Sequence, residues 1–108
     1  MSAVVAERTL ELDGVANGAV RIETPELDPK GYWRCDYELV WPGFERRRHS
    51  AGVDSYQALS LALLSSVVEI AASDDFKAGR IGALGEKIRT RRELKEVFGV
   101  HRLPGFDP

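Results

Sequence analysis

The sequence predicts an α+β domain, in which one long helix lies across one face of a four-stranded antiparallel meander. The first half of the chain holds short stretches of alternating apolar and polar side chains, separated by turn dipeptides, as in antiparallel strands joined by tight loops. A charge-poor stretch follows at residues 54–72 and is long enough for a helix that spans such a sheet. We expect a short C-terminal helix and an extension after it.

The length of the chain bounds its organisation. A chain of 108 residues can bury one modest core but not two, so we expect residues 1–108 to form a single two-layer α+β domain. The 44% hydrophobic and 30% charged content is ordinary for a globular protein and excludes disorder. The formal net charge of −2 argues neither for nor against any class of partner.

The first two strands are expected at residues 4–12 and 19–24, because apolar side chains recur there at every second position. Arg8 interrupts the apolar side of the first strand. An Asp-Gly and an Asn-Gly dipeptide lie between the two strands, so we expect a connecting loop that turns at each end.

The third strand, at residues 32–41, has the clearest alternation in the chain. Its apolar face comprises Trp33, Cys35, Tyr37, Leu39 and Trp41. A Pro-Gly turn leads to a fourth strand at residues 44–53, where three successive arginines leave neither face apolar. We expect this fourth strand at an edge of the sheet, where charge discourages pairing with other chains.

Residues 54–72 are expected to form the core helix, with Asp54 as N-cap and Gln57 completing a capping box. The stripe expected to face the sheet comprises Tyr56, Leu59, Leu63, Val67 and Ile70. A second stripe comprises Leu61, Leu64 and Val68. The remaining side carries mostly small residues. Such a helix is too apolar for a fully solvated back, so something must cover its flank.

The C-terminal section is one candidate for that cover, and a dimer seam is the other. Residues 78–87 are rich in glycine and are expected to form a loop. Thr90 and Glu93 form a capping box that opens a short helix through Phe98, and Gly99 is its stop.

No residue pattern indicates a catalytic, cofactor-binding or metal site, so we lean against an enzyme and expect no cofactor. Cys35 lies on an apolar strand face, where a packed and inert thiol is the usual outcome, and one cysteine excludes an intramolecular disulfide. His49 and His101 belong to no nucleophile or metal motif. The glycines at 79–85 fit neither the P-loop nor the dinucleotide fingerprint.

Nucleic acid and membranes are not expected partners. Successive strand residues point to opposite faces, so the three arginines at 46–48 cannot form one flat patch. The segment from Thr90 to Val100 resembles the first helix of a helix-turn-helix module, but the remaining chain is too short for a recognition helix. The N-terminus lacks a signal-peptide pattern, and the core helix is too serine-rich to span a bilayer. We therefore expect a cytoplasmic protein.

Three stretches carry a resemblance to known sequences: ERTLELDG near the start, the W-x-C-x-Y strand, and AGVDSYQALSLAL leading into the helix. Over roughly residues 7–70 the chain resembles a family of small uncharacterised bacterial domains of unknown function. This resemblance implies a ββββα layout. It implies no activity and no catalytic or binding residues.

Two functional hypotheses follow from the sequence. The first is a protein-interaction or regulatory module, for example an immunity-like partner or a homodimer, without catalytic activity. Its interaction surface would include Leu61, Leu64, Val68, Arg46 and Arg48. The alternative is a small-molecule-binding or catalytic domain, with a pocket between the sheet and the C-terminal segment near Trp33, Tyr37 and Trp41.

Overall fold

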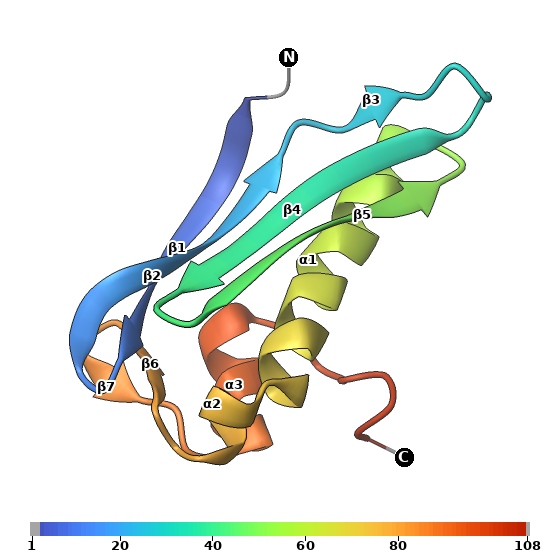
Figure 1. Cartoon of the computed structure of the whole chain (residues 1–108). Coiled ribbons are helices and arrows are strands. Elements are labelled where there is room, and N and C mark those ends of the chain that lie inside the picture. Colours follow the sequence, from blue (N-terminus) through green and yellow to red (C-terminus); the bar gives the residue numbers. More distant parts are fainter. Residues whose placement is uncertain (1–2, 108) are drawn as a thin grey trace.

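The computed structural model describes residues 3–107 as an antiparallel sheet with helices against one face (Figure 1). Within these residues the strands are β1 (Val4–Leu12), β2 (Val15–Glu23), β3 (Glu26–Leu27), β4 (Trp33–Trp41), β5 (Phe44–Gly52), β6 (Ile81–Ala83) and β7 (Glu86–Lys87). The helices are α1 (Ser55–Ala72), α2 (Asp74–Lys77) and α3 (Arg91–Phe98). The predicted α+β class is confirmed, including the long helix across the sheet and the short C-terminal helix.

The predicted four-stranded meander is formed by β1, β2, β4 and β5, each antiparallel to the next. The two-residue β3 pairs with β4 on the same side as β2. Among the described strands β5 pairs only with β4, so it lies at the edge that the arginine run predicts. At the opposite side of the meander, β6 and β7 extend the sheet beyond β1.

Residues 78–87 contain this extra hairpin, so the prediction of a loop there is wrong. β6 pairs with the end of β1, and β7 folds back on β6. Leu84 and Gly85 have φ angles of 57° and 83°, which suit a two-residue hairpin turn. A strand of three residues is too short to show an alternation of apolar and polar side chains. This strand also requires a glycine, because another part of the backbone lies close to it. A Cβ on Gly82 would lie 2.6 Å from the carbonyl oxygen of Glu86.

β2 begins at Val15, four residues before the predicted start. Asp13 and Gly14 alone make the turn between β1 and β2, with φ angles of 54° and 83°. The Asn-Gly dipeptide lies inside the strand, at a point where β4 passes close to Gly18. A Cβ there would lie 2.7 Å from the carbonyl oxygen of Val40, so this glycine allows close strand packing rather than a turn.

α1 turns its small side chains toward the core. Its buried residues are Ala58, Ala62, Ser66, Val67, Ile70 and Ala71. The predicted sheet-facing stripe is therefore wrong at Tyr56 and Leu63, which are 80% and 42% exposed, whereas Leu59, Val67 and Ile70 do pack in or against the core. Large residues of β4, including Tyr37 and Trp41, already fill the space beneath the helix. In the first half of the helix the fully buried positions are therefore the alanines Ala58 and Ala62, and larger buried side chains begin at Val67.

The backbone approaches most closely where β5 leads into α1. A Cβ on Gly52 would lie 2.5 Å from the backbone nitrogen of Ala58. The helix start is fixed by the predicted cap, since the Asp54 carboxylate accepts a hydrogen bond from the Gln57 backbone N–H at 2.8 Å. The Gln57 side chain in turn accepts one from the Val53 backbone N–H. Glycine and cap together place the small face of α1 on the sheet.

The C-terminal section covers one half of α1. Every residue from Leu64 to Ala71 is buried or half-buried, whereas most residues from Ser55 to Leu63 are exposed. Leu94 of α3 and Leu103 beyond it are fully buried in the same core, and the red C-terminal segment crosses the lower end of α1 in Figure 1. Within the second stripe, Leu64 and Val68 are thus half-buried and Leu61 is 38% exposed.

By length and composition, α1 could cross a membrane, and it is the one such helix among residues 3–107. Its contacts with β4 and β5 and its buried face are those of a core helix in a globular domain. The small side chains of that face pack against the sheet.

The orientation of α1 gives a direct stability prediction. Ala62→Leu inserts three carbons into the closely packed layer between α1 and the sheet, and we expect it to lower the free energy of unfolding by about 1–3 kcal/mol. Leu61→Ala, one residue away on the exposed side, should change it by less than about 1 kcal/mol. Urea denaturation of both variants checks this, and the reverse order of the two effects would contradict the orientation.

Candidate binding groove

A groove of about 360 Å³ lies between α1, the inner face of β1 and β2, and the end of α3. We call it the groove below. Val20 and Ile22 of β2 form its floor. Its walls and its α3 end are formed mainly by apolar residues: Ala6, Leu63, Leu64, Val67, Phe98 and Val100. Arg8 and Ser60 are among the few polar residues that line it.

The groove exists because the helices do not cover the whole inner face of the sheet. α1 lies mainly over β4 and β5. α3 is hydrogen-bonded to β1 at Arg8, where its last turn meets that strand. The part of β1 and β2 that lies before this contact, on the N-terminal side of β1, is left open beside the exposed half of α1. The leucines that the sheet does not accommodate therefore line an open space.

Arg8 links β1 to the end of α3 and lines the groove. Its guanidinium donates a hydrogen bond from Nη1 to the carbonyl oxygen of Val97 at 2.9 Å, and its Cζ lies 5.1 Å from the centre of the Phe98 ring. A cation is favourable there because the C-terminal end of a helix carries a partial negative charge. Within the described residues, Arg8 has no carboxylate within 4.0 Å. It is half-buried, so the groove holds a cation that no carboxylate of residues 3–107 neutralises directly.

Of the five residues predicted as one interaction surface, one lines the groove and two are ion-paired with α1. Leu64 lines the groove, but Leu61 and Val68 are not among its lining residues. Arg46 and Arg48 point to the helix side of β5, where both are ion-paired with Glu69 of α1, at 3.5 and 2.9 Å. These two arginines thus join β5 to α1. Both guanidinium groups share the single carboxylate of Glu69.

The aromatic residues predicted to line a pocket belong to the core instead. Tyr37 and Trp41 are almost fully buried, and Trp33 packs against the same cluster. The Trp41 indole N–H donates a hydrogen bond to Asp75 at 2.8 Å, and its ring stacks on Phe44 at 4.1 Å. The groove does lie between the sheet and the C-terminal segment, but over β1 and β2 rather than beside these aromatics.

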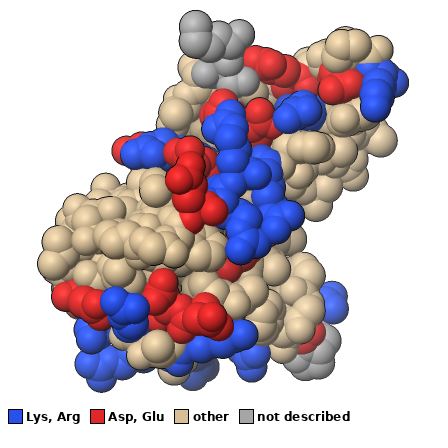
Figure 2. Space-filling view, viewed as in Figure 1, with Lys and Arg blue, Asp and Glu red and all other residues tan. Residues whose placement is uncertain are grey.

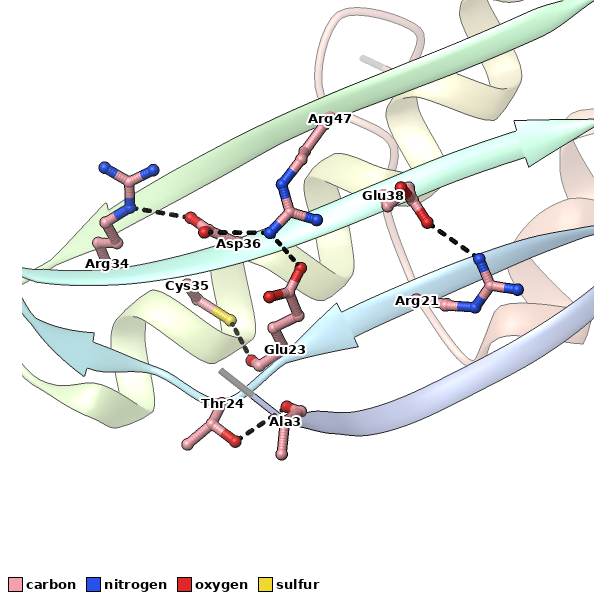
Figure 3. Close-up of polar contacts among 9 residues, drawn as sticks. All are labelled: Ala3, Arg21, Glu23, Thr24, Arg34, Cys35, Asp36, Glu38 and Arg47. Carbon is pink, nitrogen blue, oxygen red and sulfur yellow. Dashed lines mark hydrogen bonds and ion pairs between the residues drawn. The ribbon is translucent and has the colours of Figure 1, made fainter. Parts of the chain in front are cut away.

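The outer face of the sheet carries paired charges (Figure 3). Arg47 contacts Glu23 at 2.6 Å and Asp36 at 3.5 Å, and Asp36 also accepts a hydrogen bond from Arg34. Arg21 likewise binds two carboxylates, one on β1 and one on β4. Figure 2 shows basic and acidic side chains side by side over the middle of the molecule. Arg47 lies on the opposite face from Arg46 and Arg48, so the arginine run makes no single basic patch.

Cys35 is buried beneath this outer face. Its thiol donates a hydrogen bond to the carbonyl oxygen of Glu23 at 3.1 Å, and burial raises its pKa from the ordinary 9.0 to about 11. The thiolate that would act as a nucleophile or metal ligand is therefore disfavoured at neutral pH. Within residues 3–107 no group of three or more His, Cys, Asp or Glu side chains is placed to hold a metal ion.

Sequence reasoning missed the groove, although one signal was visible. Arg8 interrupts the apolar side of β1, and the structure shows that this position faces the end of α3. An arginine at an inward strand position indicates a partner beyond the strand. Only the tertiary structure shows that this partner is a helix end more than eighty residues away in the sequence.

The buried thiol predicts how stability depends on pH. The folded chain retains the Cys35 proton between about pH 9 and 11, whereas the unfolded chain releases it, so stability from this group falls as the pH rises through that range. The loss should reach roughly 2–3 kcal/mol. Urea unfolding of the wild type and of Cys35→Ala, each at pH 8 and pH 10.5, measures the part of the pH dependence of stability that comes from this thiol. Identical pH dependence in both chains would show that the thiol is not perturbed.

A family model for a domain of unknown function, DUF6968, matches residues 6–92 of this chain. The match confirms the resemblance seen in the sequence and extends from β1 into the first turn of α3, so it includes every groove residue except those at the end of α3. Neither the curated proteins nor the solved structures contain a match. The chain belongs to the DUF6968 family of domains of unknown function.

Proposed function

We propose that this domain is a binding module without catalytic activity, and that the groove is its binding site. The observation that carries the proposal is an open apolar space of about 360 Å³ between α1, β1, β2 and α3. Ligand sites in proteins are concave and mostly apolar, with volumes from roughly 300 Å³ upward and a few polar groups that orient the ligand. The groove has this composition, with Arg8 and Glu7 as the charged residues that line it.

The size of the groove favours a small molecule as its occupant. A stable protein interface buries about 800 Å² on each partner. The groove is instead a confined space at the lower end of the range for ligand pockets. Of the two functions expected from the sequence, small-molecule binding is thus the one that its shape supports best. A regulatory role would follow if the ligand changes how α3 packs against β1.

A second candidate, a protein-interaction module or homodimer, is favoured by a separate observation. Val53 and Tyr56, at the start of α1, are 82% and 80% exposed, and Leu61 lies on the same half of the helix. Exposed apolar residues gathered at one end of a helix are a common feature of protein contacts. None of these three residues lines the groove.

We also propose that the protein is bacterial and cytoplasmic, without a nucleic acid partner. A single buried cysteine fits a reducing compartment, where disulfides are rare. The pairing of the β5 arginines with Glu69, Glu23 and Asp36 supports the proposal that they do not serve as phosphate contacts.

An uncharged apolar dye, N-phenyl-1-naphthylamine, tests whether the groove binds small molecules. We expect saturable fluorescence enhancement with the wild type and a loss of at least tenfold in affinity for Leu63→Asp, which places a charge in the groove wall. The matched control is Leu61→Asp, because Leu61 is about as exposed as Leu63 and lies outside the groove lining. Equal affinity in both variants, or no binding by the wild type, would overturn the proposal.

The Leu61→Asp variant also tests the second candidate. If the exposed half of α1 is a dimer seam, the wild type scatters light as a dimer and this variant as a monomer. A monomeric wild type would contradict the proposal of a homodimer.

A further inference from the structure

Arg8 differs from the other arginines of the sheet in lacking a carboxylate partner. Arg21, Arg34, Arg46, Arg47 and Arg48 each lie within 3.5 Å of at least one acidic side chain. Arg8 donates one hydrogen bond to a backbone carbonyl and lies over an aromatic ring. The described residues thus compensate the charges of the other sheet arginines and leave this one to interact with a carbonyl, a ring and the groove.

The remaining donors of Arg8 can serve a ligand. A guanidinium carries five N–H groups in a planar fork that suits the two oxygens of a carboxylate. Only one hydrogen bond from Arg8 is made within the described part of the chain. The side chain is held in place by Val97 and Phe98, so an anion that meets it does not have to order a mobile arginine.

The other polar side chains that line the groove already have partners within the domain. The Ser60 and Ser66 hydroxyls donate hydrogen bonds to backbone oxygens of their own helix, at 2.9 and 2.8 Å. The Glu7 carboxylate is bound by Arg21 at 2.6 Å. A matching ligand therefore has an apolar body and one anionic group, placed at the end near α3.

The volume limits the length of that body. About 360 Å³ corresponds to roughly a dozen water molecules in the liquid, and so to roughly a dozen non-hydrogen atoms of ligand. A ten-carbon carboxylic acid has this size. Longer chains would extend past Ala6 into solvent, where the groove is open.

We infer that the groove binds a medium-chain amphiphile with a single anionic head group, such as a fatty acid of about ten carbons. The carboxylate lies against Arg8, and the chain runs along Leu63 and Leu64 over β2. This inference rests on the proposed function, since it names the ligand class for the same groove. It adds a role for Arg8, which both closes the α3 end of the groove and selects an anion.

The test compares decanoate with 1-decanol, which has the same chain and no charge, as competitors for the N-phenyl-1-naphthylamine dye. Both are used below the concentration at which they aggregate. We expect decanoate to displace the dye from the wild type at a concentration at least tenfold lower than decanol, as a charge-assisted hydrogen bond provides. Equal potency of the two competitors would overturn the assignment of an anionic ligand while leaving the groove as a binding site. If the dye itself does not bind to the wild type, the proposal that the groove binds small molecules is contradicted.

Two variants assign the preference to Arg8. Arg8→Gln should make decanoate and decanol equally potent. Arg8→Lys keeps the charge and loses the planar fork, so it should retain part of the preference. Arg8→Gln could lose helical circular dichroism, which would show that it does not fold. In that case the preference for decanoate is measured in Arg8→Lys, and in the wild type at 20 and 500 mM salt. A preference for decanoate that persists without Arg8, or that salt does not weaken, would contradict the role of this residue.

Discussion

The close approach of α1 to β4 and β5 is the constraint on which the rest of the structure depends. Gly52 allows the backbone of β5 to pass within contact distance of Ala58, and the large side chains of β4 fill the remaining space below the helix. Alanines then occupy the sheet side of the first half of the helix, and Val67 and Ile70 are buried only in its second half. A two-layer domain usually buries the large apolar side of its helix, and here that side is only partly buried.

The leucines that the sheet cannot accommodate shape the surface of the domain. The C-terminal section covers the second half of α1, with Leu94 and Leu103 in the shared core. It leaves the first half exposed, and Leu63 and Leu64 face the open part of the groove. Arg8 then joins the end of α3 to β1 and brings a charge to an otherwise apolar space. The candidate site is thus a consequence of how tightly the helix is held.

Local patterns predicted much of this fold, because alternation, turns and helix caps are short-range features. The third strand, the edge position of the arginine strand, and the caps at Asp54 and Thr90 are all confirmed. The errors have a common physical origin. The sequence predicts a turn at Gly18 and a loop around Gly82, whereas both glycines, like Gly52, allow a close contact with another part of the chain. The rotation of α1 depends on one such contact, and the groove depends on that rotation. Neither could be read from the periodicity of the helix alone.

Chemical-shift mapping of bound decanoate on the ¹⁵N-labelled domain tests the central claim most directly. The account predicts that the largest amide shifts fall in the four segments that line the groove, residues 6–8, 20–22, 60–67 and 98–100, with little change along β5 or at Val53 and Tyr56. Shifts centred on β5 or on the start of α1 would place binding elsewhere. That result would contradict the groove as the functional site of this domain.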